Sequence, residues 1–321
     1  MINSNSSGFA VVFGGSGFIG NFLIEELMDK EYEVLNADLI ESENSRAGFI
    51  KCDVRRTISI VLDRRPDMVF VLAATHRSPG HKSHEYFDTN VRGAENIVSW
   101  CKQARIPRII FTSSISVYGP GPDLKSEESV PKPSSAYGKS KLQSEKVFSA
   151  WQEADSESRS LVICRPSVIF GPGEKGNFSR LAHALKKGYF VIPSRNETIK
   201  ACGYVKDLVR SLIFTSNLSQ SRILIYNFSF PEEYAVREIC LSFRNVAGFK
   251  QPITIPVEVF LPALRLLPFG LNFFAIRATK LIESTRISSA KIEKLGFVWN
   301  YNLESSLKDW LENSRLPGGF A

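Results

Sequence analysis

The sequence predicts an α/β fold in which a doubly wound parallel sheet is accompanied by a smaller C-terminal α/β lobe. Short apolar runs without alternation are separated by helical patterns, as expected for strands that are buried on both faces. A glycine-rich turn joins the first such run to the first helical pattern. After about Arg165 the elements become shorter and richer in proline and glycine. We therefore predict a sheet domain at residues 1–165, with later segments crossing back to it, and a substrate lobe at 166–321.

The elements of the sheet domain follow one another as alternating strands and helices. Apolar runs predict the strands, and apolar residues at helical spacing predict the helices. The predicted strands are Phe9–Phe13, Tyr32–Ala37, Asp67–Ala74, Arg108–Ser113 and Leu161–Arg165. The predicted helices are Phe18–Lys30, Asn90–Ala104 and Tyr137–Ala154. This order is typical of the dinucleotide-binding (Rossmann) architecture.

Composition describes an ordinary globular chain. The 321 residues are 43% hydrophobic and 23% charged, which allows a large core. The net charge of +7 suits nucleic acid, a membrane surface or an anionic phosphate substrate. The basic residues are spread along the chain and form no nucleic-acid-binding motif, so we expect no nucleic-acid partner. Neither a secretory leader nor a membrane-spanning apolar stretch is evident, which favours a cytoplasmic protein.

The cysteines and histidines do not predict a metal site. The five cysteines are Cys52, Cys101, Cys164, Cys202 and Cys240. Their scattered positions favour buried reduced thiols over disulfides or zinc ligands. His76, His81 and His84 lie close together, but no partner ligands at a metal-binding spacing accompany them.

The glycine-rich turn has the context that dinucleotide binding requires. Glycine allows the backbone to approach a pyrophosphate closely, and the start of the following helix offers free N–H groups and a positive dipole end. The predicted cofactor-binding residues of this turn are Gly14, Gly17, Phe18, Ile19 and Gly20. Asp38 ends the next strand and is placed to accept hydrogen bonds from ribose hydroxyls; residues 39–41 offer no cation for a 2′-phosphate, which favours NAD. The alternative is that Asp38 is an ordinary turn residue at the end of a strand.

Tyr137 and Lys141 lie one turn apart on a predicted helix and therefore share a face. A neighbouring ammonium lowers the pKa of a phenol, so that the tyrosine can exchange a proton with a hydroxyl group. The alternative is a surface Tyr–Lys pair. The hydroxyl-rich segment Phe111–Gly119 favours the catalytic interpretation, because it follows a strand at the edge of the sheet where open α/β proteins bind ligands.

Together these motifs resemble the extended short-chain dehydrogenase/reductase family of sugar epimerases and dehydratases. Further matching segments are Asp53-Val54, Leu72–Ala74, Asn90–Gly93, Arg165–Pro172, Tyr204–Asp207 and Leu295–Phe297. The resemblance implies a catalytic triad of Ser114, Tyr137 and Lys141, and an adenine site at Asp53 and Val54. Other cofactor contacts that it implies are Leu72, Ala73, Ala74, Asn90, Ser113, Tyr137 and Lys141. It also implies a homodimer.

Departures from the family pattern narrow the implied reaction. Family 4,6-dehydratases have an acidic residue directly after the catalytic Ser or Thr, whereas this chain has Ile115 and Ser116. This favours an epimerase, which needs only hydride transfer and rotation of a ketone. Val168 and Lys200 stand where nucleotide-sugar enzymes usually have an Asn and an Arg near the diphosphate, and lysine lacks the bidentate fork of arginine.

These departures, with Ala73–Arg77 and Gly176–Phe178, resemble the epimerases that act on N-acetylglucosaminyl-diphospho-undecaprenol. We therefore expect a diphosphate-linked sugar substrate in bacterial surface glycan synthesis. The implied substrate residues are His76, Ser114, Ser116, Asn177 and Lys200. The alternatives are a UDP-sugar 4-epimerase, a 4-ketosugar reductase and a non-catalytic NAD-binding regulator.

The stretch Val257–Ile276 is the most apolar part of the chain, but Arg265 and several prolines interrupt it. We interpret it as a candidate peripheral membrane contact on the cytoplasmic face of the inner membrane. Lys250, Arg265, Arg277 and Lys280 would then meet anionic headgroups. The alternative is that this stretch forms part of the core of the substrate lobe.

Overall fold

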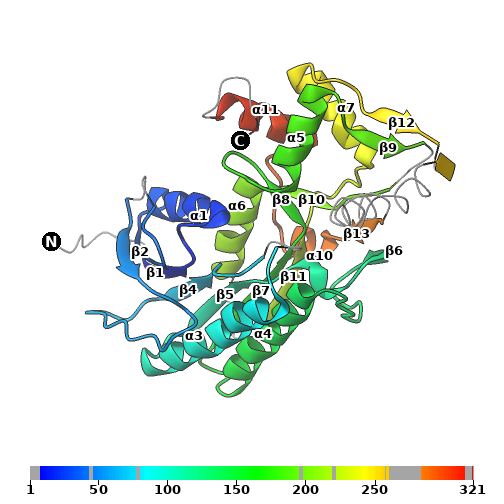
Figure 1. The fold of residues 1–321 in the computed structure, drawn as a ribbon. Helices are drawn as coiled ribbons and strands as arrows, with labels where there is room; N and C mark the ends of the chain where they lie inside the picture. Colours follow the sequence, from blue (N-terminus) through cyan, green and yellow to red (C-terminus); the bar gives the residue numbers. More distant parts are fainter. Residues whose placement is uncertain are drawn as a thin grey trace. The chain divides into compact units, whose positions relative to one another are not determined.

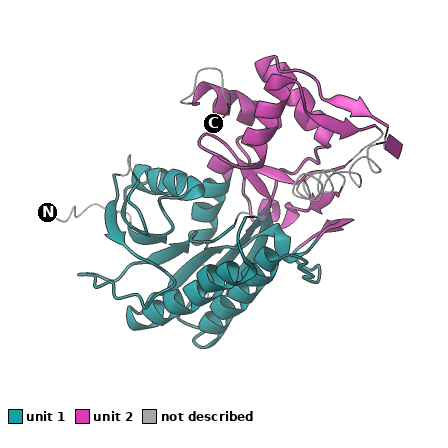
Figure 2. Cartoon of the chain, viewed as in Figure 1, with its two compact units in different colours: residues 1–119, 127–166, 208–227 teal, residues 120–126, 167–207, 228–321 magenta. Residues whose placement is uncertain are grey.

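The computed structural model describes residues 8–42, 46–76, 80–194, 198–218, 222–256, 258–259, 283–314 and 320. Except at positions 258 and 259, the Val257–Ile276 stretch lies outside these residues, as do Arg77, Arg277 and Lys280. The chain forms two compact units (Figure 2). Unit 1 comprises residues 1–119, 127–166 and 208–227, and unit 2 comprises 120–126, 167–207 and 228–321.

Unit 1 is built on a sheet with the strand order β11-β7-β5-β4-β1-β2-β3. The strands are β1 (Gly8–Phe13), β2 (Tyr32–Asp38), β3 (Gly48–Lys51), β4 (Met68–Val71), β5 (Arg108–Thr112), β7 (Ser160–Pro166) and β11 (Ile223–Phe228). The pairings from β3 to β7 are parallel. The chain winds outward from β1 in one direction and from β4 in the other, which confirms the predicted doubly wound sheet.

Helices cover both faces of this sheet (Figure 1). Helices α3 (Arg92–Gln103) and α4 (Ala136–Glu153) lie on one face, and α1 (Phe18–Asp29) and α6 (Val205–Ser216) lie on the other. Alternate strand residues such as Phe13 and Phe111 pack against Trp100 of α3 and Phe148 of α4. Burial on both faces explains why the strands are continuously apolar.

Most predicted element bounds agree with the structure to within one residue, and two do not. The helix expected to start at Asn90 is preceded by α2 (Ser83–Tyr86) and a π-helical turn (Phe87–Val91), which continue directly into α3. The strand expected to reach Ala74 ends at Val71. The N–H groups of Leu72 and Ala73 both donate to the carbonyl of Phe13, so the chain leaves the sheet at this point.

Unit 2 consists of short elements around an aromatic core. The paired strands are β6 (Gly121–Lys125) with β13 (Thr285–Ile287), β8 (Val168–Phe170) with β10 (Cys202–Tyr204), and β9 (Val191–Pro193) with β12 (Ile253–Ile255). The helices described in full are α5 (Asn177–Lys187), α7 (Val236–Ala247), α10 (Ala290–Lys294) and α11 (Leu303–Glu312). Phe170 stacks on Phe178 with a centroid distance of 4.2 Å and also contacts Trp310.

The Tyr204–Asp207 motif holds the C-terminal segment of unit 2. The buried carboxylate of Asp207 accepts hydrogen bonds from the N–H groups of Asn300 and Tyr301, just before α11. Lys206 forms an ion pair with Asp309 of α11 at 2.7 Å. These contacts give the motif a structural role. None of the described helices combines the length and apolar character needed to cross a bilayer.

Candidate active site

The glycine turn forms a tight connection between β1 and α1. Gly14 has a φ of +86°, and a Cβ atom there would lie 2.4 Å from the backbone nitrogen of Ala73. A Cβ atom on Gly20 would lie 2.5 Å from the carbonyl oxygen of Gly14. A Cβ atom on Gly17 would approach only one neighbouring atom, the carbonyl oxygen of Gly14, at 3.3 Å. Gly14 and Gly20 therefore serve the packing of the turn, whereas Gly17 leaves space beside it for a ligand.

Helix α1 begins with an uncapped amino terminus that suits an anion. Its N-cap residue is Gly17, no side chain caps its N–H groups, and its first turn, which includes Phe18 and Ile19, contains no acidic residue. Free N–H groups and the helix dipole favour a phosphate in this position. Helix α5 differs, because the N–H and hydroxyl groups of Ser179 donate to the carboxylate of Glu174 at 2.9 and 2.6 Å. The amino end of α1 thus fits the pyrophosphate of NAD.

Asp38 lies beside the glycine turn at the carboxyl end of β2. Its oxygens accept hydrogen bonds from the N–H groups of Ser16 and Leu39, at 3.0 and 2.6 Å. These bonds orient the carboxylate and leave acceptor capacity for ribose hydroxyls. The position fits the ribose end of NAD.

Asp53 and Val54 follow β3 and are held by neighbours that the sequence did not reveal. Arg55 donates from Nε and Nη2 to the two oxygens of Asp53, both at 2.8 Å, and these bonds lower the pKa of Asp53. The carbonyl of Val54 accepts a bond from Asn96 of α3 at 2.7 Å. A Cβ atom on Gly93 would lie 3.0 Å from the Val54 side chain. The predicted adenine site is therefore fixed against α3.

Asn90 lies in the π-helical turn and links two parts of the site. Its amide oxygen accepts from the Thr75 N–H group at 2.9 Å, and its amide nitrogen donates to the Thr75 carbonyl at 3.1 Å and to Ser140 Oγ at 2.8 Å. These bonds fasten the loop after β4, which contains Leu72, Ala73 and Ala74, to α4. Both amide hydrogens are used, so a contact with the cofactor through this amide would require them to be released.

Ser114 and Tyr137 meet at the carboxyl edge of the sheet. Ser114 follows β5 and caps the short 3-10 turn Ile115–Val117, and Tyr137 lies in the first turn of α4. Burial raises the pKa of Tyr137 to about 12, a side-chain hydrogen bond with Ser114 opposes this shift, and nearby Tyr86 adds to it. The Tyr86 and Tyr137 rings are 6.2 Å apart. No sequence pattern marks Tyr86 as part of this site.

Lys141 lies one turn after Tyr137 and is 2% exposed. Its ammonium donates to the Thr112 carbonyl at 2.7 Å and lies 4.7 Å from the centre of the Phe111 ring. Burial lowers the pKa of Lys141 to about 7, and the charge of Glu145 opposes this shift. The site therefore contains a phenol and an amine whose pKa values depend strongly on nearby charge, as in many proton-transfer sites.

Ser113 and the predicted substrate residues have separate surroundings. The Ser113 hydroxyl donates to Glu145 at 2.5 Å and so belongs to the support of α4. Ser116 Oγ accepts from Ser114 Oγ at 3.1 Å, and His76 is exposed in the loop after β4. Asn177 and Lys200 lie in unit 2. Asn177 accepts a bond from Arg180 at 2.8 Å, and the Lys200 ammonium donates to the Glu283 carbonyl.

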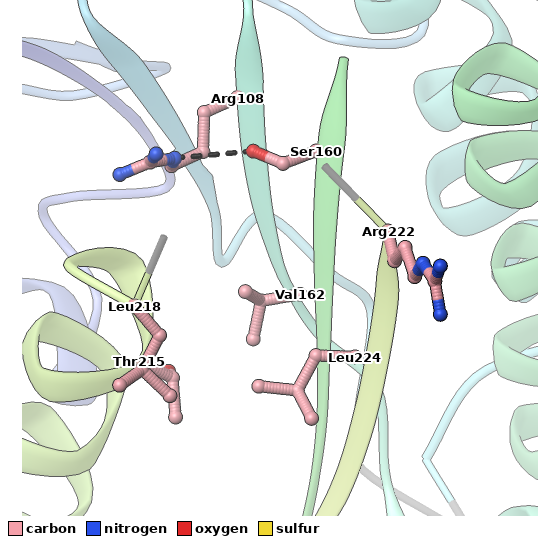
Figure 3. Close-up of a pocket in the computed structure, with 7 residues that line it drawn as sticks. All are labelled: Arg108, Ser160, Val162, Thr215, Leu218, Arg222 and Leu224. Atoms are coloured by element: carbon pink, nitrogen blue, oxygen red, sulfur yellow. Dashed lines mark hydrogen bonds between the residues drawn. The ribbon is translucent and has the colours of Figure 1, made fainter. Parts of the chain in front are cut away.

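A small cavity in unit 1 lies away from these residues. Its volume is about 10 Å³ and its lining includes Ser160, Val162 and Leu224, near the amino ends of β5, β7 and β11. Arg108 donates to Ser160 at 3.1 Å, and Arg222 points to the other side of β11 (Figure 3). The cavity has room for about one water molecule and cannot hold a sugar.

Comparisons with known proteins show which family and which proteins this chain is similar to. A sequence profile of the NAD dependent epimerase/dehydratase family matches residues 10–227. The chain is 27% identical over 319 residues to the N-acetyl-alpha-D-glucosaminyl-diphospho-ditrans,octacis-undecaprenol 4-epimerase of Escherichia coli O157:H7, covering 94% of each. It is 29% identical over 277 residues to the UDP-glucose 4-epimerase of Lactobacillus helveticus, covering 76% of this chain and 83% of that protein. The solved structure of MoeE5 in complex with UDP-glucuronic acid and NAD has a TM-score of 0.76 at 25% identity, and the match covers 95% of this chain and 98% of that one.

Proposed function

The chain belongs to the NAD dependent epimerase/dehydratase family, and from this premise we propose that it is an NAD-dependent sugar 4-epimerase. The observation that carries the proposal is the hydrogen bond between Ser114 and Tyr137, with the buried Lys141 one turn along α4, beside a turn that has no acidic residue. The turn after Ser114 presents Ile115 and Ser116. An elimination of water would need an acid or base at this point, whereas an epimerisation does not.

The proposed residues share the proton chemistry among them. NAD supplies a hydride acceptor and then a hydride donor when it is bound. Tyr137 takes the proton of the C4 hydroxyl group and later returns it, while Ser114 donates a hydrogen bond to the same oxygen. Lys141 stabilises the tyrosinate with its positive charge, because an opposite charge nearby lowers the pKa of a phenol. The 4-keto sugar rotates between the two hydride transfers, so the configuration at C4 is inverted.

A 4-ketosugar reductase is the rival within the same chemistry. An epimerase regenerates its cofactor in every cycle, so product should form without added NADH, and NAD should copurify with the protein. A reductase needs stoichiometric NADH and releases the oxidised form. Mass spectrometry of the purified protein, together with turnover without added nucleotide, separates the two functions. Strict dependence of product on added NADH would contradict the epimerase proposal.

We propose that the substrate is N-acetylglucosamine linked through a diphosphate to a polyprenol, in bacterial surface polysaccharide synthesis. Val168 and Lys200 provide neither the amide nor the forked guanidinium expected near a nucleotide-linked diphosphate. The similarity to the undecaprenol-linked epimerase over 94% of the chain supports this choice. UDP-sugar 4-epimerase activity is the second candidate, and the similarity to the Lactobacillus helveticus enzyme supports it.

The deciding experiment compares two substrates. UDP-N-acetylglucosamine and the same sugar on a polyprenyl diphosphate are offered to the NAD-containing protein, and the C4 epimers are measured. Preference for the lipid-linked sugar supports the proposal. Efficient epimerisation of the UDP-sugar, without turnover of the lipid-linked one, would leave a nucleotide-sugar epimerase.

We also propose a peripheral membrane contact on the face of unit 2 formed by Lys187, Tyr189, Lys250 and Ile253. Tyr189 and Ile253 are 58% and 49% exposed, and both lysines are exposed. Ile253 pairs with Val191 at the start of strands β12 and β9, the Lys250 side chain lies against Gly188, and the chain continues from β12 into the Val257–Ile276 stretch. Exposed apolar and basic side chains together suit an anionic lipid surface.

A cytoplasmic homodimer is the assembly we propose, testable by sedimentation of the purified protein.

A further inference from the structure

A buried ion pair lies behind Lys141 in unit 1. Glu145 of α4 accepts hydrogen bonds from Arg165 Nε at 2.9 Å and Arg165 Nη2 at 2.7 Å. The side chains of Arg165 and Glu145 are only 5% and 6% exposed. Removing two charges from water costs free energy that their attraction often fails to recover. A contribution to stability therefore does not by itself explain why this ion pair lies at α4, the helix that carries Tyr137 and Lys141.

The pair holds both ends of the segment that carries Ser114. Ser113 donates its hydroxyl hydrogen to Glu145. Arg165 Nη1 donates to the Tyr118 hydroxyl at 2.9 Å, and this hydroxyl donates to Asn227 at 2.7 Å. Ser113 precedes Ser114, and Tyr118 closes the short turn that follows it. The position of Ser114 relative to α4 thus depends on these buried bonds.

Glu145 also acts on the charge of Lys141, which lies four residues before it on α4. Among the described residues, Glu145 of α4 acts on this ammonium, β5 contributes the Thr112 carbonyl and the Phe111 ring, and Arg165 of β7 lies beyond Glu145. Glu145 raises the pKa of Lys141 against the effect of burial. Arg165 and Ser113 bind the carboxylate, so Glu145 acts on Lys141 from a fixed position.

We infer that Glu145, held by Arg165 and Ser113, is a positioning residue for the reaction at Tyr137. Its buried charge keeps Lys141 as the ammonium that the tyrosinate requires, and its bonds hold the Ser114 segment against α4. The catalytic part of this inference rests on the proposed function. The effect on the charge of Lys141 is measurable without any substrate.

The test compares Glu145→Gln with the double variant Glu145→Gln/Arg165→Met. The single variant leaves a buried unpaired guanidinium and can lose stability for that reason alone. The double variant removes both charges, so it measures the net effect of the pair on Lys141 without leaving an unpaired guanidinium. NMR of protein labelled with ¹³C at the lysine Cε follows the titration of Lys141, which Lys141→Met assigns. Steady-state kcat and KM are measured across the neutral pH range.

We expect the pKa of Lys141 in the folded double variant to fall by about one unit or more. Because a neutral Lys141 no longer stabilises the tyrosinate, kcat at about pH 7 should fall by about fivefold or more, with KM little changed. The matched control is Glu153→Gln, which removes a charge from the exposed end of α4 and should leave both values unchanged.

Two results separate the inference from the proposed function. Wild-type titration of Lys141 together with wild-type kcat in the double variant would overturn the inference and leave the pair a purely structural feature. A lowered Lys141 pKa, in a protein whose wild-type form epimerises neither sugar substrate, would support the charge effect and refute the proposed function.

Discussion

Burial raises the pKa of Tyr137 to about 12, so this phenol needs a nearby positive charge to exchange a proton near neutral pH. Tyr137→Phe keeps the ring and removes the oxygen that exchanges the proton. We expect epimerisation to slow by about 10²–10⁴-fold, with NAD still bound, since the glycine turn is untouched. Tyr32→Phe, at the amino end of β2, is the control. Near-normal turnover in the Tyr137 variant would contradict its proposed role.

We expect the buried Lys141 to lower the free energy of unfolding of the protein. Its pKa of about 7 in the folded protein lies below the ordinary value of 10.5. Between these values the unfolded chain binds more protons, so stability rises with pH in this window, and the full cost is present below about pH 7. Lys141→Met should therefore be more stable than the wild type by about 1 kcal/mol or more at about pH 6, with the difference shrinking toward about pH 10.

Urea unfolding of both nucleotide-free proteins at several pH values measures this difference. Tyr137 does not interfere, because its raised pKa affects stability above its ordinary value of 10.0. A difference that stays constant from acid to alkaline pH would show that the effect comes from packing, and not from the charge of Lys141.

Single residues could be predicted where chemistry restricts the residue type. Tyr137 and Lys141 stand at a helical spacing, and the hydroxyl-rich segment containing Ser114 follows a recognisable strand. The partners of Glu145 could not be predicted in this way. Arg165 lies on a different element, and the two side chains meet only when β7 and α4 pack together. Local sequence patterns do not predict which distant residues pair in the folded protein.

At the scale of elements, periodicity predicted strands and helices well where burial decides them. Periodicity did not predict the element bounds that depend on tertiary hydrogen bonds. The residues before α3 join a continuous helix through a π-helical turn, at which Asn90 bonds to Thr75 and Ser140. The strand β4 stops at Val71 because the following N–H groups turn to Phe13. Hydrophobic spacing alone predicts neither event.

The turn between β1 and α1 allows fold and cofactor binding to be tested separately. Gly17→Ala adds a Cβ atom that meets little protein, so we expect a change in unfolding free energy below about 1 kcal/mol and weaker retention of NAD. Gly14→Ala places a side chain at a φ of +86° against Ala73, and should destabilise the fold by about 1–3 kcal/mol or more. Urea unfolding and NAD content of the purified variants measure both effects. Full NAD retention in Gly17→Ala would show that the cofactor does not approach this position.

At the scale of the whole molecule, the net charge of +7 favours anionic surfaces. We expect liposomes with anionic lipids to bind the protein, and added salt to release it. The double variant Lys187→Glu/Lys250→Glu should bind less, whereas Lys102→Glu, on the exposed side of α3 in unit 1, should have a smaller effect. Cosedimentation measures binding. Equal loss of binding in both variants would indicate a nonspecific charge effect and refute the proposed membrane face.

The path of the chain through unit 1 has a consequence for biosynthesis. Strand β11 and Asn227 belong to this unit but follow β7 only after residues 167–207 have been made. At about 5–20 residues per second, a ribosome needs several seconds to make that intervening segment. During this time β7 is an open edge strand, and Tyr118 lacks its partner Asn227. A nascent chain whose emerged part ends near Pro166 should therefore be a target for chaperones, although it already contains every residue of the proposed catalytic triad.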